Sequence, residues 1–358
     1  METISNKLRD YSNQNIYTGI DVHDTSWKVT IYSDEFELKT FSQEPDVNGL
    51  ANHLKNNYKN ANFLLAYEAG FCGFWVQRAF AEKGINCRVI HPADVPTSNK
   101  EQLRKTDKVD SKKIAKGLKN GELNFIHIPD RELELDRQLL RSRGLLAKDS
   151  TRVKNRIKSI LKLQGIEIPQ AYGNGSWSEK FIQWLKALDL KSVSGNVAMQ
   201  TQIRELVFLN EQKKQTDAAV KTLSASERYK SNAKLLQTIP SVGVLSAMIL
   251  LTEIGDIHRF KRLDDLCSYC GLVPNCHSSG ENERTGGLSR RGNAAMKNVL
   301  IECAWVAVKK DPALLLYYKQ QITHMQGQKA IIKVARKLLS RIRYVLINQK
   351  EYVTGVIE

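Results

Sequence analysis

The sequence predicts an α/β domain at residues 1–129, followed by two mostly helical units. Short apolar or alternating runs between residues 16 and 92 are typical of strands, and helical patterns separate them. After residue 130 the composition changes to long helical periodicities. A chain of 358 residues, of which 42% are hydrophobic, is long enough to form two or three domains with cores of their own.

The N-terminal domain is expected to begin with three consecutive strands. The first, IYTGIDV, is short and apolar and carries Asp21 near its end. The second, SWKVTIYS, alternates, so that Trp27, Val29 and Ile31 lie on one side of the strand. FELKTFS continues the alternating pattern, and a polar helical stretch follows at about residues 45–58.

The rest of this domain repeats strand and helix. NFLLAYEA is typical of a buried strand with Glu68 near its C-terminal end, GFWVQRAFAEKG of a helix capped by Gly84, and NCRVIHP of a further strand. Three strands, a helix, a strand, a helix and a strand form the order of a ribonuclease H-like α/β domain, which should end near Pro129.

Residues 130–230 are expected to form a helical hairpin or coiled coil. Long helical patterns are interrupted only by GIEIPQAYGNGSWSE. Apolar residues recur at helical spacing in the first arm: Leu139, Leu145, Val153, Ile157, Ile160 and Leu161. This arm is rich in Lys and Arg, which predicts a basic outer face. A dimerisation coil is the alternative interpretation, and one coil can serve both purposes.

Residues 231–358 are expected to form a mostly helical unit. LLQTIPSVGVLSAMILLTEIGD is typical of two helices joined by a Pro-x-x-Gly turn, as in helix-hairpin-helix elements that bind phosphate. A long polar, Gly-rich loop follows, and a loop of this length inside a compact domain is usually functional. The last helix is basic and amphipathic. Its expected bases are Lys329, Lys333, Arg336, Lys337 and Arg343, opposite Ile332, Ala335, Leu338, Leu339 and Ile342.

The charge balance predicts an acidic partner. Lys and Arg number 54 against 38 Asp and Glu, a formal net charge of +16, which favours nucleic acid over a membrane surface. No apolar run approaches the ~20 residues needed to span a bilayer. The polar N-terminus has no apolar core for export. We therefore expect a soluble cytoplasmic protein without a membrane partner.

The cysteines are expected to be reduced and buried rather than zinc ligands. Cys267 and Cys270 have C-x2-C spacing, and Cys276 and His277 follow only a few residues later. A structural zinc site normally closes with a second pair a dozen or more residues away. The first pair also lies on an expected helix.

Four acidic residues at characteristic positions predict a metal site. Asp21 lies on the first strand, Glu68 ends the fourth, and Asp107 and Asp110 share one face of a helix in KTDKVDSKK. Cleavage of a phosphodiester by two metals needs hard oxygen ligands that hold Mg²⁺ ions about 4 Å apart. Sugar kinases share the strand order, but in them a Gly-containing turn that binds phosphate follows the first aspartate. The corresponding segment here, DVHDTSWK, has no glycine, so we set the kinase interpretation aside.

The motifs GIDV, YEAG, KTDKVDSKKIA, TIPSVGVLSAMILLTEIGDIHRF, YCGLVPNCHSSG and GLSRRGNAAMKNVLIECAW together resemble one family. It is the DEDD transposases of bacterial insertion sequences, which include the Piv-type pilin-gene invertases. The resemblance implies a RuvC-like domain with Asp21, Glu68, Asp107 and Asp110 as a metal-binding tetrad, a coiled-coil middle, and a transposase domain. It also implies a nucleophilic serine at Ser279. From the residues alone, Ser278 in the same loop remains an alternative.

The resemblance further implies the reaction and the partners. The chain would cut and rejoin donor and target DNA through a phosphoserine intermediate, guided by a structured RNA that the element encodes. Two Mg²⁺ ions would serve as cofactors, with Mn²⁺ able to substitute, and a homodimer would assemble to a tetramer.

Basic residues near these motifs are candidate nucleic-acid ligands. Arg284, Arg290 and Arg291 follow the serine and could clamp phosphates. Arg104, Lys105 and Lys112 flank the paired aspartates, and Lys154 lies on the basic arm.

Two other functions stay open on the residues. A RuvC-like junction resolvase would use the same acids and hydrolyse DNA with water, leaving no DNA attached to the protein. A non-catalytic nucleic-acid-binding protein would bind without Mg²⁺ and break no strand.

Overall fold

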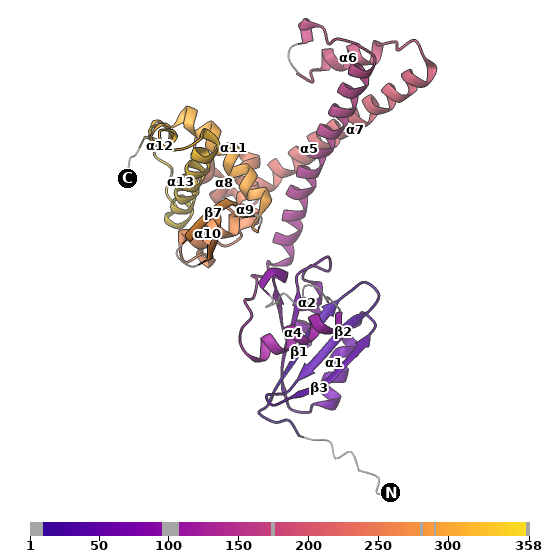
Figure 1. Ribbon diagram of the computed structural model, residues 1–358, viewed down its shortest axis with the longest axis vertical. Helices are drawn as coiled ribbons and strands as arrows, with labels where there is room; N and C mark the ends of the chain where they lie inside the picture. The colour runs from indigo at the N-terminus through magenta and orange to yellow at the C-terminus, as the bar shows by residue number, and fades with distance from the viewer. Residues whose placement is uncertain (1–9, 95–106, 173–175, 280–281, 290, 356–358) are drawn as a thin grey trace. The chain divides into compact units, whose positions relative to one another are not determined.

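The computed structural model describes residues 10–94, 107–172, 176–279, 282–289 and 291–355. The chain divides into two compact units, Met1–Pro129 and Asp130–Glu358. Each unit is described by itself below (Figure 1). The further division of the second unit at residue 230 stays a prediction.

A five-stranded sheet forms the centre of the first unit, and its strand order is β3-β2-β1-β4-β5. β1 is antiparallel to β2 and parallel to β4, β2 is antiparallel to β3, and β4 is parallel to β5. The strands lie where the alternating and apolar runs predicted them. They are β1 Asn15–Val22, β2 Trp27–Tyr32, β3 Glu37–Gln43, β4 Asn62–Glu68 and β5 Asn86–Ile90.

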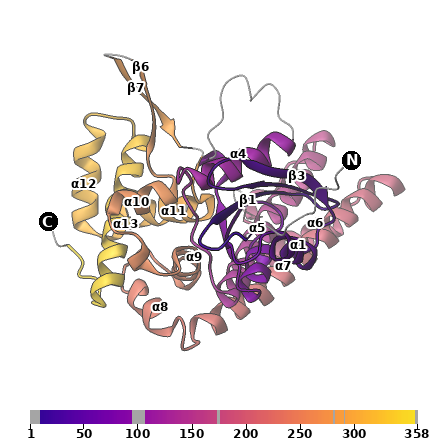
Figure 2. The ribbon, with the colours of Figure 1, turned by 90° about the horizontal axis from the view of Figure 1, so that it is seen from below.

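Helices cover both faces of this sheet. α1 and α4 lie on opposite sides of the strands (Figure 2), and α2 packs in the same apolar cluster as α1. Trp27, Val29 and Ile31 are fully buried in that cluster, as the alternation predicted. The helices of this unit are α1 Val47–Asn57, α2 Trp75–Glu82 and α4 Asp107–Lys119, and the 3-10 turn η1 is Pro92–Asp94.

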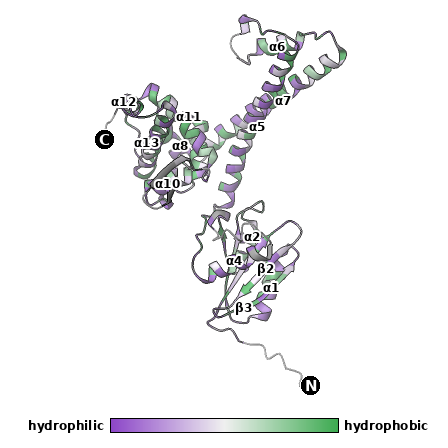
Figure 3. Ribbon diagram, viewed as in Figure 1, coloured by the Kyte–Doolittle hydropathy of each residue, from purple (hydrophilic) through white to green (hydrophobic). Residues whose placement is uncertain are grey.

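Two long antiparallel helices begin the second unit. α5 spans Arg131–Leu163 and α7 spans Val193–Ser224, and the short α6, Glu179–Ala187, lies between them in sequence. Arg143 pairs with Asp217, and Arg156 pairs with Glu205. Residue numbers increase along α5 while those of the paired residues decrease along α7, so the two helices run antiparallel. Both hydrophilic and hydrophobic residues occur along these helices (Figure 3). A coiled coil over this region stays a prediction.

The expected apolar stripe of the first arm is only partly buried. Val153, Ile157 and Leu161 lie in a core with Phe181 of α6 and residues of α7. Leu145 is instead 58% exposed. An α-helix buries only the stripe that faces its neighbour, so an apolar residue on another face stays in solvent.

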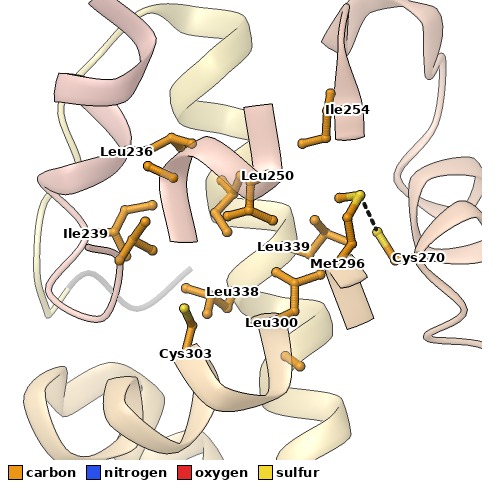
Figure 4. Packing of buried hydrophobic residues seen from close by; sticks show 14 of the residues in the cluster. Leu236, Ile239, Leu250, Ile254, Cys270, Met296, Leu300, Cys303, Leu338 and Leu339 are labelled. Atoms are coloured by element: carbon orange, nitrogen blue, oxygen red, sulfur yellow. Dashed lines mark hydrogen bonds between the residues drawn. The ribbon is translucent and has the colours of Figure 1, made fainter. Parts of the chain in front are cut away.

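The helices after residue 229 share one apolar core, which Figure 4 shows from close by. The predicted helix–turn–helix is present as α8 and α9. Cys267 and Cys270 are buried free thiols, as expected, and the Cys270 sulfur lies 4.0 Å from that of Met296. Burial raises the pKa of Cys270 to about 12. The helices are α8 Lys230–Gln237, α9 Val244–Ile254, α10 Leu263–Cys270, α11 Ala294–Lys310, α12 Pro312–Ile322 and α13 Gly327–Asn348, with the 3-10 turn η3 Ile257–Arg259. Another 3-10 turn, η2 Gln170–Tyr172, lies earlier in the chain between α5 and α6.

The expectation of an irregular Gly-rich loop after α10 is wrong. The backbone forms a two-stranded antiparallel hairpin, β6 Pro274–Ser279 with β7 Asn282–Leu288. The hairpin projects from the helices of this unit (Figure 2). The segments PNCHSS and NERTGGL lack an alternation of apolar and polar residues, which is the pattern by which strands are recognised.

The last helix, α13, is amphipathic as predicted, with Ala335, Leu338, Leu339 and Ile342 buried. At least four of its bases have polar partners within the unit: Lys333 donates to Gln321 and Arg341 pairs with Asp311. Arg336 pairs with Asp264, and Arg343 donates to the carbonyls of Phe260 and Lys261. Of the helices in the described ranges, none has the length and hydropathy needed to cross a membrane.

Candidate active site

A close contact between β1 and α4 sets the geometry of the candidate site. A Cβ atom on Gly19 would lie 2.1 Å from the carbonyl oxygen of Ser111 and 2.5 Å from the amide nitrogen of Ala115. Both neighbours are backbone atoms and cannot move aside as a flexible side chain can. Only glycine therefore allows α4 to lie this close to β1.

A chain of polar side chains fastens α4 to the antiparallel half of the sheet. The hydroxyl of Thr30 is 2.9 Å from that of Ser111 and 3.0 Å from that of Thr40, which donates to Glu37 at 2.8 Å. Lys112 forms a 2.5 Å ion pair with the same carboxylate. Its hydrogen bond is the main reason that the pKa of Glu37 lies below the usual value. These contacts fix both the position and the rotation of α4.

The sheet places Asp21 and Glu68 side by side. Ile20 pairs with Tyr67 in the parallel β1–β4 register, so the next residue of each strand is Asp21 and Glu68. Successive residues of a strand alternate between its faces. Asp21 lies two residues after Gly19, which contacts α4, and therefore faces the same side of the sheet.

Glu68 and α4 share this face as well. Ala66, two residues before Glu68, packs against Ile114 of α4. α4 runs opposite to β1, because Ser111 lies near Gly19 while Ala115 packs against Tyr17 at the start of the strand. The N-terminal end of α4 is thus at the edge where β1 and β4 end.

The elements that carry the predicted acids consequently meet at one edge of the sheet. Asp21, Glu68 and Asp110 are each half-buried there. The Asp21 carboxylate lies 3.2 Å from Nε2 of His23. Asp107 is the first residue of α4, but its side chain lies outside the described part of the chain.

Oxygen ligands of this kind suit Mg²⁺ by their chemistry. Within the described side chains, no three Asp, Glu, His or Cys groups come close enough together to hold a metal ion. Asp21, Glu68 and Asp110 belong to this set, so the three do not form such a group by themselves. Asp107 lies outside the set, and the convergence of the whole tetrad stays a prediction.

The candidate serines lie at the far end of the hairpin. Ser279 is the last residue of β6 and pairs with Asn282, and Ser278 pairs with Glu283. His277 pairs with Arg284 one step further back. The side chains of these residues lie outside the described part of the chain, so the choice between the two serines stays a prediction.

The base of the hairpin is anchored by backbone contacts that the sequence did not reveal. The amide of Ser289 donates to the carbonyl of Val273 at 2.9 Å. Gly292, with φ +117°, packs against Gly271, and a Cβ there would lie 2.6 Å from the Gly271 nitrogen. The hairpin therefore starts and ends on a rigid platform.

The predicted nucleic-acid ligands differ in their surroundings. Lys112 is paired with Glu37, as described above. Lys154 is half-buried on α5, with Nζ 5.4 Å from the ring centre of Trp177. Burial, followed by the charges of Lys213 and Lys158, lowers the pKa of Lys154. Arg291 is exposed at the base of the hairpin.

Four further candidate ligands have side chains outside the described part of the chain. Arg104, Lys105 and Arg290 lie outside the described residues, and the side chain of Arg284 does too.

Family models match the part of the chain that carries the candidate acids and the part that carries the candidate serines. Residues 18–165, which include every predicted tetrad position, match a transposase model of the DEDD type. Residues 233–319, which include the serine hairpin, match the model described as the transposase IS116/IS110/IS902 family. The two domains thus define an insertion-sequence transposase. The chain belongs to the IS110/IS116/IS902 transposases, and the resemblance that the motifs predicted is confirmed.

Curated relatives resemble most of the chain at moderate identity. Two Sinorhizobium fredii proteins named as candidate transposases, y4qE and y4rJ, are 27% and 28% identical over 69% and 82% of this chain. The transposase for insertion sequence element IS1111A of Coxiella burnetii is 27% identical over 78%. The chain spans 59%, 79% and 76% of these three relatives, respectively.

We expect Gly19→Ala to lower the free energy of unfolding of the first unit, at the upper end of the ~1–3 kcal/mol that overpacking costs. The new methyl group would push α4 away from β1. The matched control is Gly70→Ala, since no atom beyond its neighbours is nearer than 4.0 Å. Urea unfolding followed by hydrogen exchange in β1 and α4 measures the change. Equal costs for the two substitutions would contradict the close contact.

Proposed function

We propose that this protein cuts and rejoins DNA as the transposase of an insertion sequence. The observation that supports the proposal is that the elements carrying Asp21, Glu68 and Asp110 meet at one edge of a sheet, in a chain that belongs to a transposase family. An edge where parallel strands and a helix N-terminus meet is a common place for a reaction centre in α/β folds.

Four carboxylates would hold the metal in this proposal: Asp21, Glu68, Asp107 and Asp110. Two Mg²⁺ ions are the expected cofactors, and Mn²⁺ could replace them. When bound, such ions neutralise the phosphate oxygens on which charge develops. The protein's own part is to keep the carboxylates in place, which the contacts of Gly19 and Ser111 with α4 and the sheet support.

Ser279 would supply the nucleophile. Its hydroxyl oxygen forms a bond to phosphorus, a bridging P–O bond breaks, the serine gives up a proton and the released oxygen gains one. The phosphodiester linkage is thereby conserved on the protein and can be passed to a second DNA end. The place of Ser279 at the end of β6 supports this role, because a residue next to a hairpin tip can reach a large ligand. Ser278 is the alternative.

The partners proposed are DNA, both donor ends and target, and a structured guide RNA encoded by the same element. A homodimer that assembles to a tetramer would bring two pairs of DNA ends together. The net charge of +16 and the neighbouring Lys154, Lys158 and Lys213 support a polyanionic partner. Sequencing of RNA that copurifies with the protein would test the guide, and RNA unrelated to the DNA beside the gene would contradict it.

We expect Ser279→Ala to abolish the covalent protein–DNA adduct, whereas Ser278→Ala should leave it. The assay is a denaturing gel with labelled duplex DNA that carries the sequences flanking the gene, in the presence of copurified RNA. Adducts with Ser279→Ala but not with Ser278→Ala would move the nucleophile to Ser278. Cut DNA without any adduct in the unaltered protein would instead favour hydrolysis by a junction resolvase.

We expect Asp21→Asn and Asp110→Asn each to lower the rate of adduct formation by at least about 100-fold, since each removes a proposed metal ligand. Neither change should lower the melting temperature, because each relieves repulsion between neighbouring carboxylates. Asp24→Asn, an exposed acid close by in sequence, is the matched control. EDTA should abolish activity, and Mg²⁺ or Mn²⁺ should restore it. Full activity in EDTA would contradict the metal site.

A further inference from the structure

Glu253 is a buried carboxylate on an otherwise apolar helix. It belongs to the apolar helix α9 and is 1% exposed. Acidic side chains are seldom fully buried unless they are paired, because removal from water destabilises their charged form. The proposed reaction makes no use of this residue, so its contacts indicate what else it does.

One side of Glu253 faces the long helix α5. Arg141 donates two hydrogen bonds to the carboxylate, from Nε to Oε1 at 2.8 Å and from Nη2 to Oε2 at 2.9 Å. Arg137 donates to the main-chain carbonyls of Thr252 at 2.6 Å and Glu253 at 3.1 Å. A bidentate Arg–carboxylate pair fixes both distance and orientation. α9 is thus locked to α5 at this point.

The other side of Glu253 holds the base of the serine hairpin. Nδ2 of Asn293 donates to Oε2 at 2.7 Å, and Oδ1 of the same residue accepts from the amide of Met296 and caps α11. The Asn293 amide donates to the carbonyl of Tyr269 at 2.7 Å. The Tyr269 hydroxyl donates in turn to the main-chain carbonyl of Glu253 at 3.0 Å.

These bonds form a closed ring of three residues. Tyr269 precedes the hairpin and Asn293 follows it, so the ring joins both of its ends to α9. Burial alone would raise the pKa of Glu253, but the bonds from Arg141 and Asn293 and the charge of Arg137 outweigh it and leave the pKa below its usual value. The carboxylate therefore stays ionised at neutral pH.

Small changes in orientation at the base of the hairpin are amplified at its tip. β6 has six residues, so its tip lies roughly 20 Å from its base at ~3.3 Å per residue. A tilt of a few degrees at the base moves the tip by about 1 Å. A misplacement of ~1 Å between reacting groups can cost roughly 100-fold in rate.

We propose that Glu253 is a positioning residue that holds the serine hairpin in a fixed orientation relative to α5, through Asn293 on one side and Arg141 on the other. The proposal rests on the proposed function, since it takes Ser279 to be the reacting group. Glu253 would touch neither DNA nor metal. Its loss should slow the reaction at saturating DNA while binding stays the same.

Two substitutions separate this role from simple stabilisation of the core. Glu253→Gln keeps the shape and removes the charge, and Arg141 remains hydrated because its side chain is 59% exposed. Asn293→Ser keeps a good N-cap for α11 but cannot reach Glu253. The control is Asp217→Asn, which breaks another two-bond Arg–carboxylate pair of α5, with Arg143, away from the hairpin.

The experiment measures adduct formation on the full chain together with hydrogen exchange of the Ser289 and Asn293 amides. For Glu253→Gln and Asn293→Ser we expect exchange at these amides to be at least tenfold faster. The adduct rate at saturating DNA should be at least tenfold lower, and the DNA dissociation constant should stay within twofold. Asp217→Asn should change neither rate. Asn293→Ser decides the matter if Glu253→Gln does not fold.

Other outcomes would overturn the inference in recognisable ways. Faster exchange throughout α9 and α11 would indicate a general structural role. Unchanged adduct formation in both variants, with Ser279→Ala inactive in parallel, would contradict the positioning role alone. If both Ser279→Ala and Ser278→Ala still formed adducts, the proposed function would fail first.

Discussion

The contact of Gly19 with the backbone of α4 is the constraint on which the candidate site depends. Asp21 lies two residues after Gly19, and Asp110 directly precedes Ser111, whose carbonyl makes the contact. One close approach therefore brings a strand acid and a helix acid to the same edge. The chain of hydroxyls from Ser111 to Thr40 then prevents α4 from turning about its axis.

Much of the first unit could be predicted because its pattern is local. Alternation in SWKVTIYS identifies a strand with one buried face, and Trp27, Val29 and Ile31 do line the core. The acids could be placed on their elements for the same reason. The requirement for glycine at position 19 could not be predicted, because it arises from backbone atoms more than 90 positions away in the sequence.

In the second unit, hydrophobic patterning fails to predict the β6–β7 hairpin and the role of Glu253. PNCHSS and NERTGGL form strands without the alternation by which strands are predicted, so their sequence predicts a loop instead. Glu253 lies in an apolar helix and had no local sign of a role. Its partner Arg141 is 112 residues away in the sequence. Such a pair can be recognised only when the fold brings the two residues together.

Two arginines and a group of lysines on the long helices α5 and α7 have different surroundings. Arg143 and Arg156 of α5 are paired with acids of α7, so these arginines join the two helices. Lys154 instead lies close enough to Lys213 and Lys158 for their charges to add to burial in lowering its pKa. Mutual repulsion among lysines favours the approach of a polyanion, which would relieve it.

The start of α4 at Asp107 has a consequence for the charge of its acidic residues. The N-terminal end of an α-helix carries a partial positive charge from its aligned peptide dipoles, equivalent to roughly half an elementary charge. Asp107 and Asp110 both lie in the first turn of α4. The dipole favours the ionised form of a carboxylate at this end of the helix, so it offsets part of the free-energy cost of two acids within four residues of each other.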